Sequence, residues 1–163
     1  MALVRTVITA PAVTNYNNLP NASLASCAAI SVGTTTNIAD HEVMVTLTST
    51  AITGGATTIV NLYAYASIDG TNWSGSGTTN ELIDGADKTI TWSANGNQAI
   101  YLGTIAFTTT TAGTIVYRSK RISMAAAFGG TLPSKYVIVI QNQSSGALAG
   151  SGNSILVNEL SFS

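Results

Sequence analysis

The chain has 163 residues and a formal net charge of −1; only 8% of its residues are charged, while 45% are apolar. This apolar content excludes a disordered chain, and the length suits one domain whose core needs no disulfide. The nearly neutral charge argues against a nucleic-acid partner, and no apolar run approaches the roughly 18 residues that would span a bilayer.

Residues 1–26 are expected to form either an extended N-terminal arm or the first strand of the domain. Apolar and polar residues alternate briefly from Leu3 to Thr9, and Asn and Pro residues, which favour extended and turn conformations, follow as far as Asn21. The start lacks the charged residues and the apolar run of a signal peptide, so we expect a soluble protein that is not secreted by the classical route. The segment from Thr9 to Asn21 is the candidate for reaching a neighbouring molecule.

Residues 27–163 are expected to form a single β-sandwich domain. Apolar and polar residues alternate over 42–50 and 57–67, and the second stretch places Tyr63 and Tyr65 on a partly exposed face opposite an alanine-rich core face. The strongest prediction is a central strand over Lys135–Gln143, because its run of β-branched and aromatic residues favours a sheet. The other predicted strands, separated by turn residues, cover 28–32, 88–93, 99–107, 114–124 and 154–162.

These patterns predict an all-β fold. About eight or nine short strands, without helical periodicity or an internal repeat, are typical of a sandwich. Because the connecting loops differ in length, we expect a jelly-roll-like antiparallel β-sandwich and not a simple meander. Either Val137 and Val139 or Ile138 and Ile140 should fill its core.

Three segments, 63–73, 101–105 and 125–143, carry a resemblance to a group of known proteins. They include a Ser-Ile-Asp-Gly-Thr-Asn-Trp sequence and a Phe-Gly-Gly-Thr-Leu-Pro sequence. Over residues 60–162 the chain resembles small jelly-roll structural proteins of tailed-phage virions, of the capsid cement or decoration type. The first of the two motifs also looks like a stretch of discoidin-type jelly rolls, which bind sugars or lipid headgroups.

The resemblance implies a protein on the capsid exterior, made in the host cytoplasm, that binds and stabilises the lattice of the major capsid protein. A surface with few charges gives little repulsion between packed copies, which fits such a role or an ordinary β-rich extracellular domain. A subunit that bridges neighbouring capsomers gains strength from linked contacts, so we expect a dimer or a trimer. No membrane partner is expected.

Charged residues mark candidate contacts with a partner or with another copy. Four basic residues fall within 18 positions, and three acidic residues form a loop. Complementary charge on one small molecule favours such contacts, although basic residues at strand edges can also merely discourage unwanted sheet pairing. The candidate partner contacts are Arg118, Lys120, Arg121, Lys135, Glu81, Asp84 and Asp87.

The sequence offers little for catalysis. His41, the one histidine, lies between two acidic residues at the start of a strand and is expected to be a solvated turn residue. Cys27 is the one cysteine, and its small neighbours indicate a buried apolar side chain, not a reactive thiol. The acidic residues lack the spacing of a calcium loop. We therefore expect no enzyme activity, no cofactor and no metal.

The alternative function is a carbohydrate-binding module or a tail or adhesion module. Flat apolar faces of sugars stack on aromatic rings, so a group of aromatic side chains could serve as a platform. The two tryptophans could instead cap the ends of the sandwich as part of its core. The candidate platform residues are Tyr63, Tyr65, Trp73 and Trp92.

Overall fold

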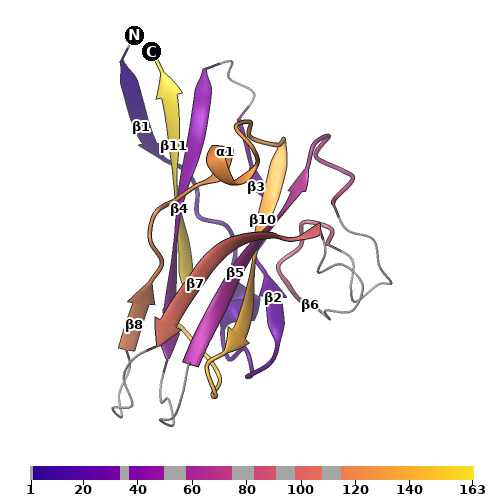
Figure 1. The fold of residues 1–163 in the computed structure, drawn as a ribbon, viewed down its shortest axis with the longest axis vertical. Coiled ribbons are helices and arrows are strands. Elements are labelled where there is room, and N and C mark those ends of the chain that lie inside the picture. Colours follow the sequence, from indigo (N-terminus) through magenta and orange to yellow (C-terminus); the bar gives the residue numbers. More distant parts are fainter. Residues whose placement is uncertain (1, 34–36, 50–57, 75–82, 91–97, 108–114) are drawn as a thin grey trace.

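The computed structural model describes residues 2–33, 37–49, 58–74, 83–90, 98–107 and 115–163. Their regular secondary structure is almost all β, with 53% strand and 6% helix, and the strands form two antiparallel sheets packed face to face (Figure 1). The predicted all-β sandwich is therefore confirmed.

We call the two sheets sheet A and sheet B. Both chain ends lie side by side at one end of sheet A (Figure 1). Sheet A has the order β1 (Leu3–Val7), β11 (Ser154–Phe162), β4 (Ile38–Ser49) and β8 (Ile115–Arg118), and β9 (Ile122–Ser123) also pairs with β4. Sheet B has the order β6 (Lys88–Ile90), β2 (Leu24–Ser26), β10 (Lys135–Gln143), β5 (Thr58–Ser67) and β7 (Ile100–Phe107), and β3 (Ile30–Ser31) also pairs with β10.

The strand order is that of a jelly roll. Late strands lie between early ones, since β11 separates β1 from β4 and β10 separates β2 from β5. The pairs β1–β11, β2–β10, β4–β8 and β5–β7 correspond to one long antiparallel ribbon wound into two sheets, to which β3, β6 and β9 add short pairings. This topology agrees with the jelly-roll-like prediction.

The central strand β10 has the predicted bounds. It is flanked by β5 on one side and by β2 and β3 on the other, so its backbone is paired along both edges. The sequence left open which pair of side chains fills the core, and all four, from Val137 to Ile140, are fully buried. A strand with both faces covered carries a continuous apolar run instead of an alternating one.

The N-terminal segment folds onto its own domain. Within it, η1 (Thr14–Tyr16) is one turn of 3-10 helix, and Tyr16 and Leu19 are 0% and 2% exposed. The Tyr16 hydroxyl donates to the Ile138 carbonyl of β10 at 2.9 Å. The segment Thr9–Asn21, expected to reach a neighbouring molecule, instead packs on its own domain, because these two apolar side chains belong to the core.

The predicted strand over 114–124 is interrupted. It splits into β8 and β9, and α1 (Met124–Ala127) follows directly. The Ser123 hydroxyl starts this short helix by accepting a hydrogen bond from the Ala126 amide at 3.1 Å, and the Asp40 carboxylate accepts one from the Ala125 amide at 2.7 Å. Across the described ranges, no helix has the length and apolar character needed to cross a membrane.

Candidate functional site

The outer face of sheet A carries most of the exposed large apolar side chains. Along β4 and β11, alternate residues such as Val43 and Val157 point inward and are fully buried. Their neighbours point outward, and cross-strand partners share a face. In the described residues, eight large apolar side chains are exposed, and five of them lie on this face, which we call the sheet A face: Leu3 (60%), Val7 (65%), Val116 (48%), Leu156 (38%) and Phe162 (44%).

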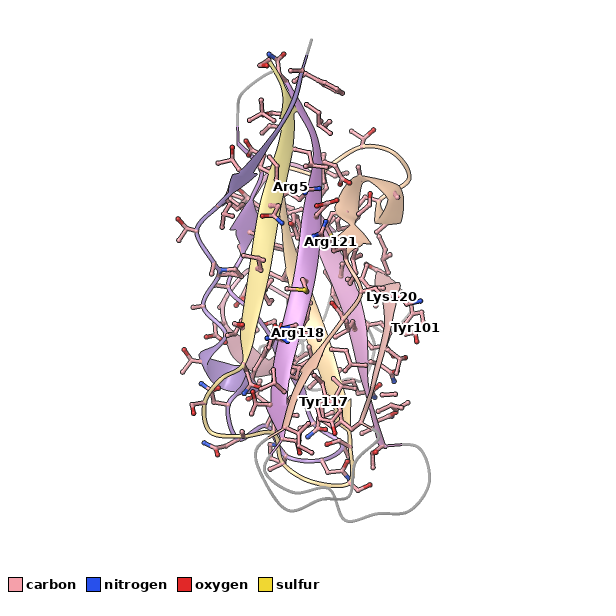
Figure 2. The ribbon with its side chains drawn as sticks, turned by 90° about the vertical axis from the view of Figure 1, so that its left-hand side faces the viewer. Arg5, Tyr101, Tyr117, Arg118, Lys120 and Arg121 are labelled. Carbon is pink, nitrogen blue, oxygen red and sulfur yellow. The ribbon has the colours of Figure 1, made fainter. Side chains whose placement is uncertain are left out.

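Basic side chains accompany this apolar surface. Arg5 reaches from β1 across β11 to Glu42 on β4, where its Nη2 lies 2.9 Å from Oε2, and Arg121 Nη1 lies 4.0 Å from the same oxygen. Arg118 and Lys120 take part in no ion pair among the described residues. Figure 2 shows Arg5, Arg121 and Arg118 over β11 and β4, and Lys120 at the edge of this face, beside Tyr101 of β7. Lys120 also lines a pocket with Thr104 of β7. We call these four residues the basic row; among the ion pairs of the described residues only Glu42 offsets their charge, so the row is positive.

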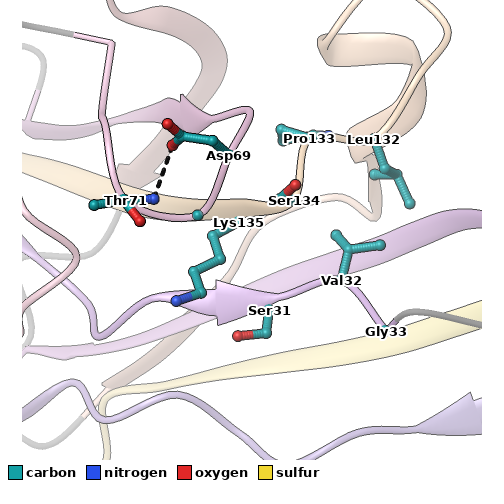
Figure 3. A pocket seen from close by; sticks show the side chains of 10 residues that line it. Ser31, Val32, Gly33, Asp69, Thr71, Leu132, Pro133, Ser134 and Lys135 are labelled. Carbon is teal, nitrogen blue, oxygen red and sulfur yellow. Dashed lines mark hydrogen bonds between the residues drawn. The ribbon is translucent and has the colours of Figure 1, made fainter.

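Lys135 does not belong to this row. It begins β10 in sheet B, between Ser31 of β3 and Ser67 of β5. It lines a separate pocket of about 610 Å³ together with the turn around Asp69 and the segment 132–134 (Figure 3). The four basic residues that are close in sequence are therefore divided between two surfaces, because the chain crosses from sheet A to sheet B after α1.

The carboxylate in that pocket serves its own turn. Asp69 accepts hydrogen bonds from the backbone amides of Asn72 at 2.7 Å and Thr71 at 2.9 Å, the second of which is drawn in Figure 3. These backbone hydrogen bonds hold the pKa of the exposed Asp69 carboxyl well below its ordinary value. The pocket therefore contains the Lys135 side chain and a carboxylate whose oxygens already accept hydrogen bonds from its own turn.

The predicted acidic loop also makes internal contacts. Asp87 accepts hydrogen bonds from the amides of Thr14 at 2.6 Å and Asn15 at 3.1 Å, and so ties the N-terminal segment to the rest of the domain. Asp84 accepts one from the Lys88 ammonium at 2.9 Å. The remaining candidate of this loop, Glu81, lies outside the described residues.

Sequence reasoning missed Arg5, which is far from the other basic residues in the chain and joins them through the pairing of β1 with β11.

The aromatic platform differs from the predicted one. Tyr65 is 2% exposed and cannot offer a ring face to a ligand, so its predicted partial exposure is wrong. Trp73 is half-buried, and its ring packs so closely on Gly85 that a Cβ there would lie 2.6 Å from Cζ2. Trp92 lies outside the described residues. Tyr63 is half-buried, and its ring lies beside that of Tyr101, with centroids 5.6 Å apart.

Tyr101 was missed because of a bulge. Strict alternation would place Tyr101 and Thr104 on opposite faces of β7, but the pairing with β5 shifts by one residue between Leu62 and Tyr63, so both lie outside. Gly103, at the shift, has a φ of +137°. A glycine inside a strand is the sequence signal for such a bulge.

Two of the candidates considered for catalysis, His41 and Cys27, are buried. His41 is fully buried and not solvated as expected; its Nδ1 lies 3.0 Å from the Tyr136 hydroxyl and its Nε2 3.7 Å from Glu159 Oε2. Burial lowers the pKa of His41, against the opposing effect of Glu159. Burial raises the pKa of the Cys27 thiol to about 12, in line with its predicted role as a buried apolar side chain. No group of three metal-ligating side chains occurs among the described residues.

Two surfaces of the described residues are therefore suited to binding: the sheet A face with its basic row, and the Tyr63–Tyr101 pair on sheet B. No protein-family model matches the chain, and no curated protein matches it either.

Proposed function

We propose that the protein is a virion structural protein of the capsid cement or decoration type, which binds the lattice of the major capsid protein of a tailed phage through the sheet A face. The observation that carries this proposal is the grouping of five exposed apolar side chains on one face beside the basic row. Single exposed apolar residues are ordinary, whereas several on one face of a small domain favour an interaction surface. The jelly-roll fold and the resemblance over residues 60–162 are the reasons for proposing a capsid protein as the partner.

The charge of the face defines the chemistry of that partner. Arg5 and Arg121 share one carboxylate, that of Glu42, and Arg118 and Lys120 add further positive charge. If two copies packed this face against itself around a two-fold axis, the basic rows would oppose each other. The face therefore suits an apolar surface with acidic side chains on a different protein. A dimer or trimer of this chain would use other surfaces and leave this one for the capsid.

Two observations on particles test the proposal. Mass spectrometry of purified virions should detect the protein, and its absence would remove the idea. A labelled antibody should bind the capsid; label on the tail would move the protein to the alternative tail or adhesion role.

Binding to particles that lack the protein then tests the face itself. Leu156→Asp and Arg118→Glu change exposed side chains, so the fold should survive, and each should weaken binding by about tenfold or more because a charge is desolvated or reversed at the contact. Ile68→Asp, directly after β5 of sheet B, introduces a charge at an apolar side chain that is 85% exposed; it is the matched control and should bind like the wild type. Wild-type binding by both sheet A variants would show that another surface makes the contact.

A further inference from the structure

The outer face of sheet B holds an exposed aromatic pair in line with amide side chains. Tyr101 of β7 and Tyr63 of β5 are cross-strand partners, with ring centroids 5.6 Å apart and ring planes inclined by 59°. Tyr101 is 58% exposed. An exposed tyrosine ring supported by a second ring offers an apolar surface on which the C–H faces of a sugar can pack.

A directional hydrogen-bond chain extends from this pair across three strands. The Tyr101 hydroxyl contacts Thr104 Oγ1, which donates to Asn61 Oδ1 at 2.9 Å. Asn61 Nδ2 donates to the side-chain oxygens of Gln141 and Gln143 of β10, both at 3.2 Å. Each link fixes the next, so the amide groups are oriented before any ligand arrives.

The chain leaves its donors facing outward. Because the side-chain oxygens of Gln141 and Gln143 accept from Asn61, their Nε2 groups are directed away from it, and they donate to no group in the described part of the chain. Gln141 Oε1 also accepts from the Tyr63 hydroxyl at 3.4 Å, which places one of these amides beside the aromatic pair. The hydroxyl groups of a sugar can accept hydrogen bonds from these amide donors. Its C–H faces can pack at the same time on the neighbouring aromatic ring.

We propose that this surface is a binding site for a neutral oligosaccharide. None of its six side chains carries a charge, which suits the hydroxyl and acetamido groups of a neutral sugar. The cation Lys120 lies at the edge of the site (Figure 2), where it lines a pocket with Thr104. The site crosses β7, β5 and β10, two strand spacings or roughly 10 Å, so it accommodates more than one sugar ring. The residues of the site are Asn61, Tyr63, Tyr101, Thr104, Gln141 and Gln143.

This inference does not depend on the proposed function. The two outer faces of a sandwich point in opposite directions, so a molecule held through sheet A would present sheet B to its surroundings. The site also differs from the platform expected from the sequence, since Tyr101 replaces the buried Tyr65 as its main ring.

The test uses the full chain labelled for NMR, with the hexasaccharides of β-1,4-glucose, α-1,4-glucose and β-1,4-N-acetylglucosamine as probes. At least one of them should shift the resonances of β5, β7 and β10 saturably at up to millimolar concentration. Tyr101→Ala should weaken this binding by about tenfold and Gln143→Ala by about threefold, because the first removes the stacking surface and the second one donor. Phe162→Ala, on the sheet A face, is the control and should bind as the wild type does.

Three outcomes would overturn the proposal. The first is that none of the three sugars shifts any resonance. The second is that the shifts map to the surroundings of Trp73 and persist in Tyr101→Ala. The third is that the Tyr101 resonances change with protein concentration and not with sugar, which would make this face a contact between copies of the chain.

Discussion

Replacing Tyr16 by alanine measures how much the N-terminal segment contributes to stability. Its side chain is fully buried, so truncation should cost about 3–5 kcal/mol, from lost apolar burial and the cavity left behind. Tyr16→Phe removes only the hydroxyl. The Ile138 carbonyl that this hydroxyl contacts also accepts from the Cys27 amide at 3.0 Å, so it stays satisfied and the loss should be about 0.5–1.5 kcal/mol. The difference between the two variants isolates the packing contribution.

Urea unfolding followed by circular dichroism gives these free energies from the midpoint and the slope. The alanine variant should lose a large part of the 5–15 kcal/mol typical of a domain, and its Tm should fall by roughly 6–20 °C, at about 2–4 °C for each kcal/mol. Val7→Ala, at a side chain that is 65% exposed, is the control and should change stability by no more than about 0.5 kcal/mol. Deleting residues 2–20 should unfold the domain, whereas deleting 2–7 should not. If Tyr16→Ala were as stable as Val7→Ala, the segment would not be part of the core.

Two further predictions concern a buried histidine and a glycine. Burial lowers the pKa of His41 in the folded protein below its ordinary value near 6.5. The stability contributed by the neutral imidazole should therefore be complete above about pH 6.5. It should be lost as the pH falls from about 6.5 towards the lower pKa of the folded state, because the unfolded chain then binds more protons. A difference between wild type and His41→Gln that does not change with pH across this range would contradict it. Gly85→Ala should cost more stability than Gly129→Ala in urea unfolding, because both glycines have a positive φ but only at Gly85 would the new Cβ meet the ring of Trp73. Equal costs for the two would show that the ring moves aside freely.

Local patterns in the sequence were enough to predict the strands of the core. The bounds of β10 follow from its unbroken run of β-branched and aromatic residues, and the inward face of β5 follows from alternation. The same alternation, extended back from Val43 along β4, would have placed His41 inside; its charged neighbours suggested solvent instead. For these elements the information lies within a few residues of the position concerned.

What could not be predicted depends on residues far apart in the chain. Alternation assigns Tyr65 to the outer face of sheet B, but it does not reveal that this part of the face is covered. The carboxylate of Asp87 is satisfied by amides more than seventy positions away, so its sequence neighbours gave no reason to separate it from a contact surface. Likewise, Arg5 reaches Glu42 only because β11 lies between their two strands.

The position of β10 and β11 in the sheets also determines when this chain can fold during its synthesis. Of the strands described, β1 pairs with β11 alone, and β2 is joined to β5 only through β10. A ribosome makes these two connecting strands after the other strands described, so neither sheet can close while residues 135–162 are still missing. Folding is then a late event that depends on long-range pairing, which is slow and leaves strand edges unpaired in the nascent chain. A product that ends before residue 135 would lack the strands that join each sheet and could not form this sandwich.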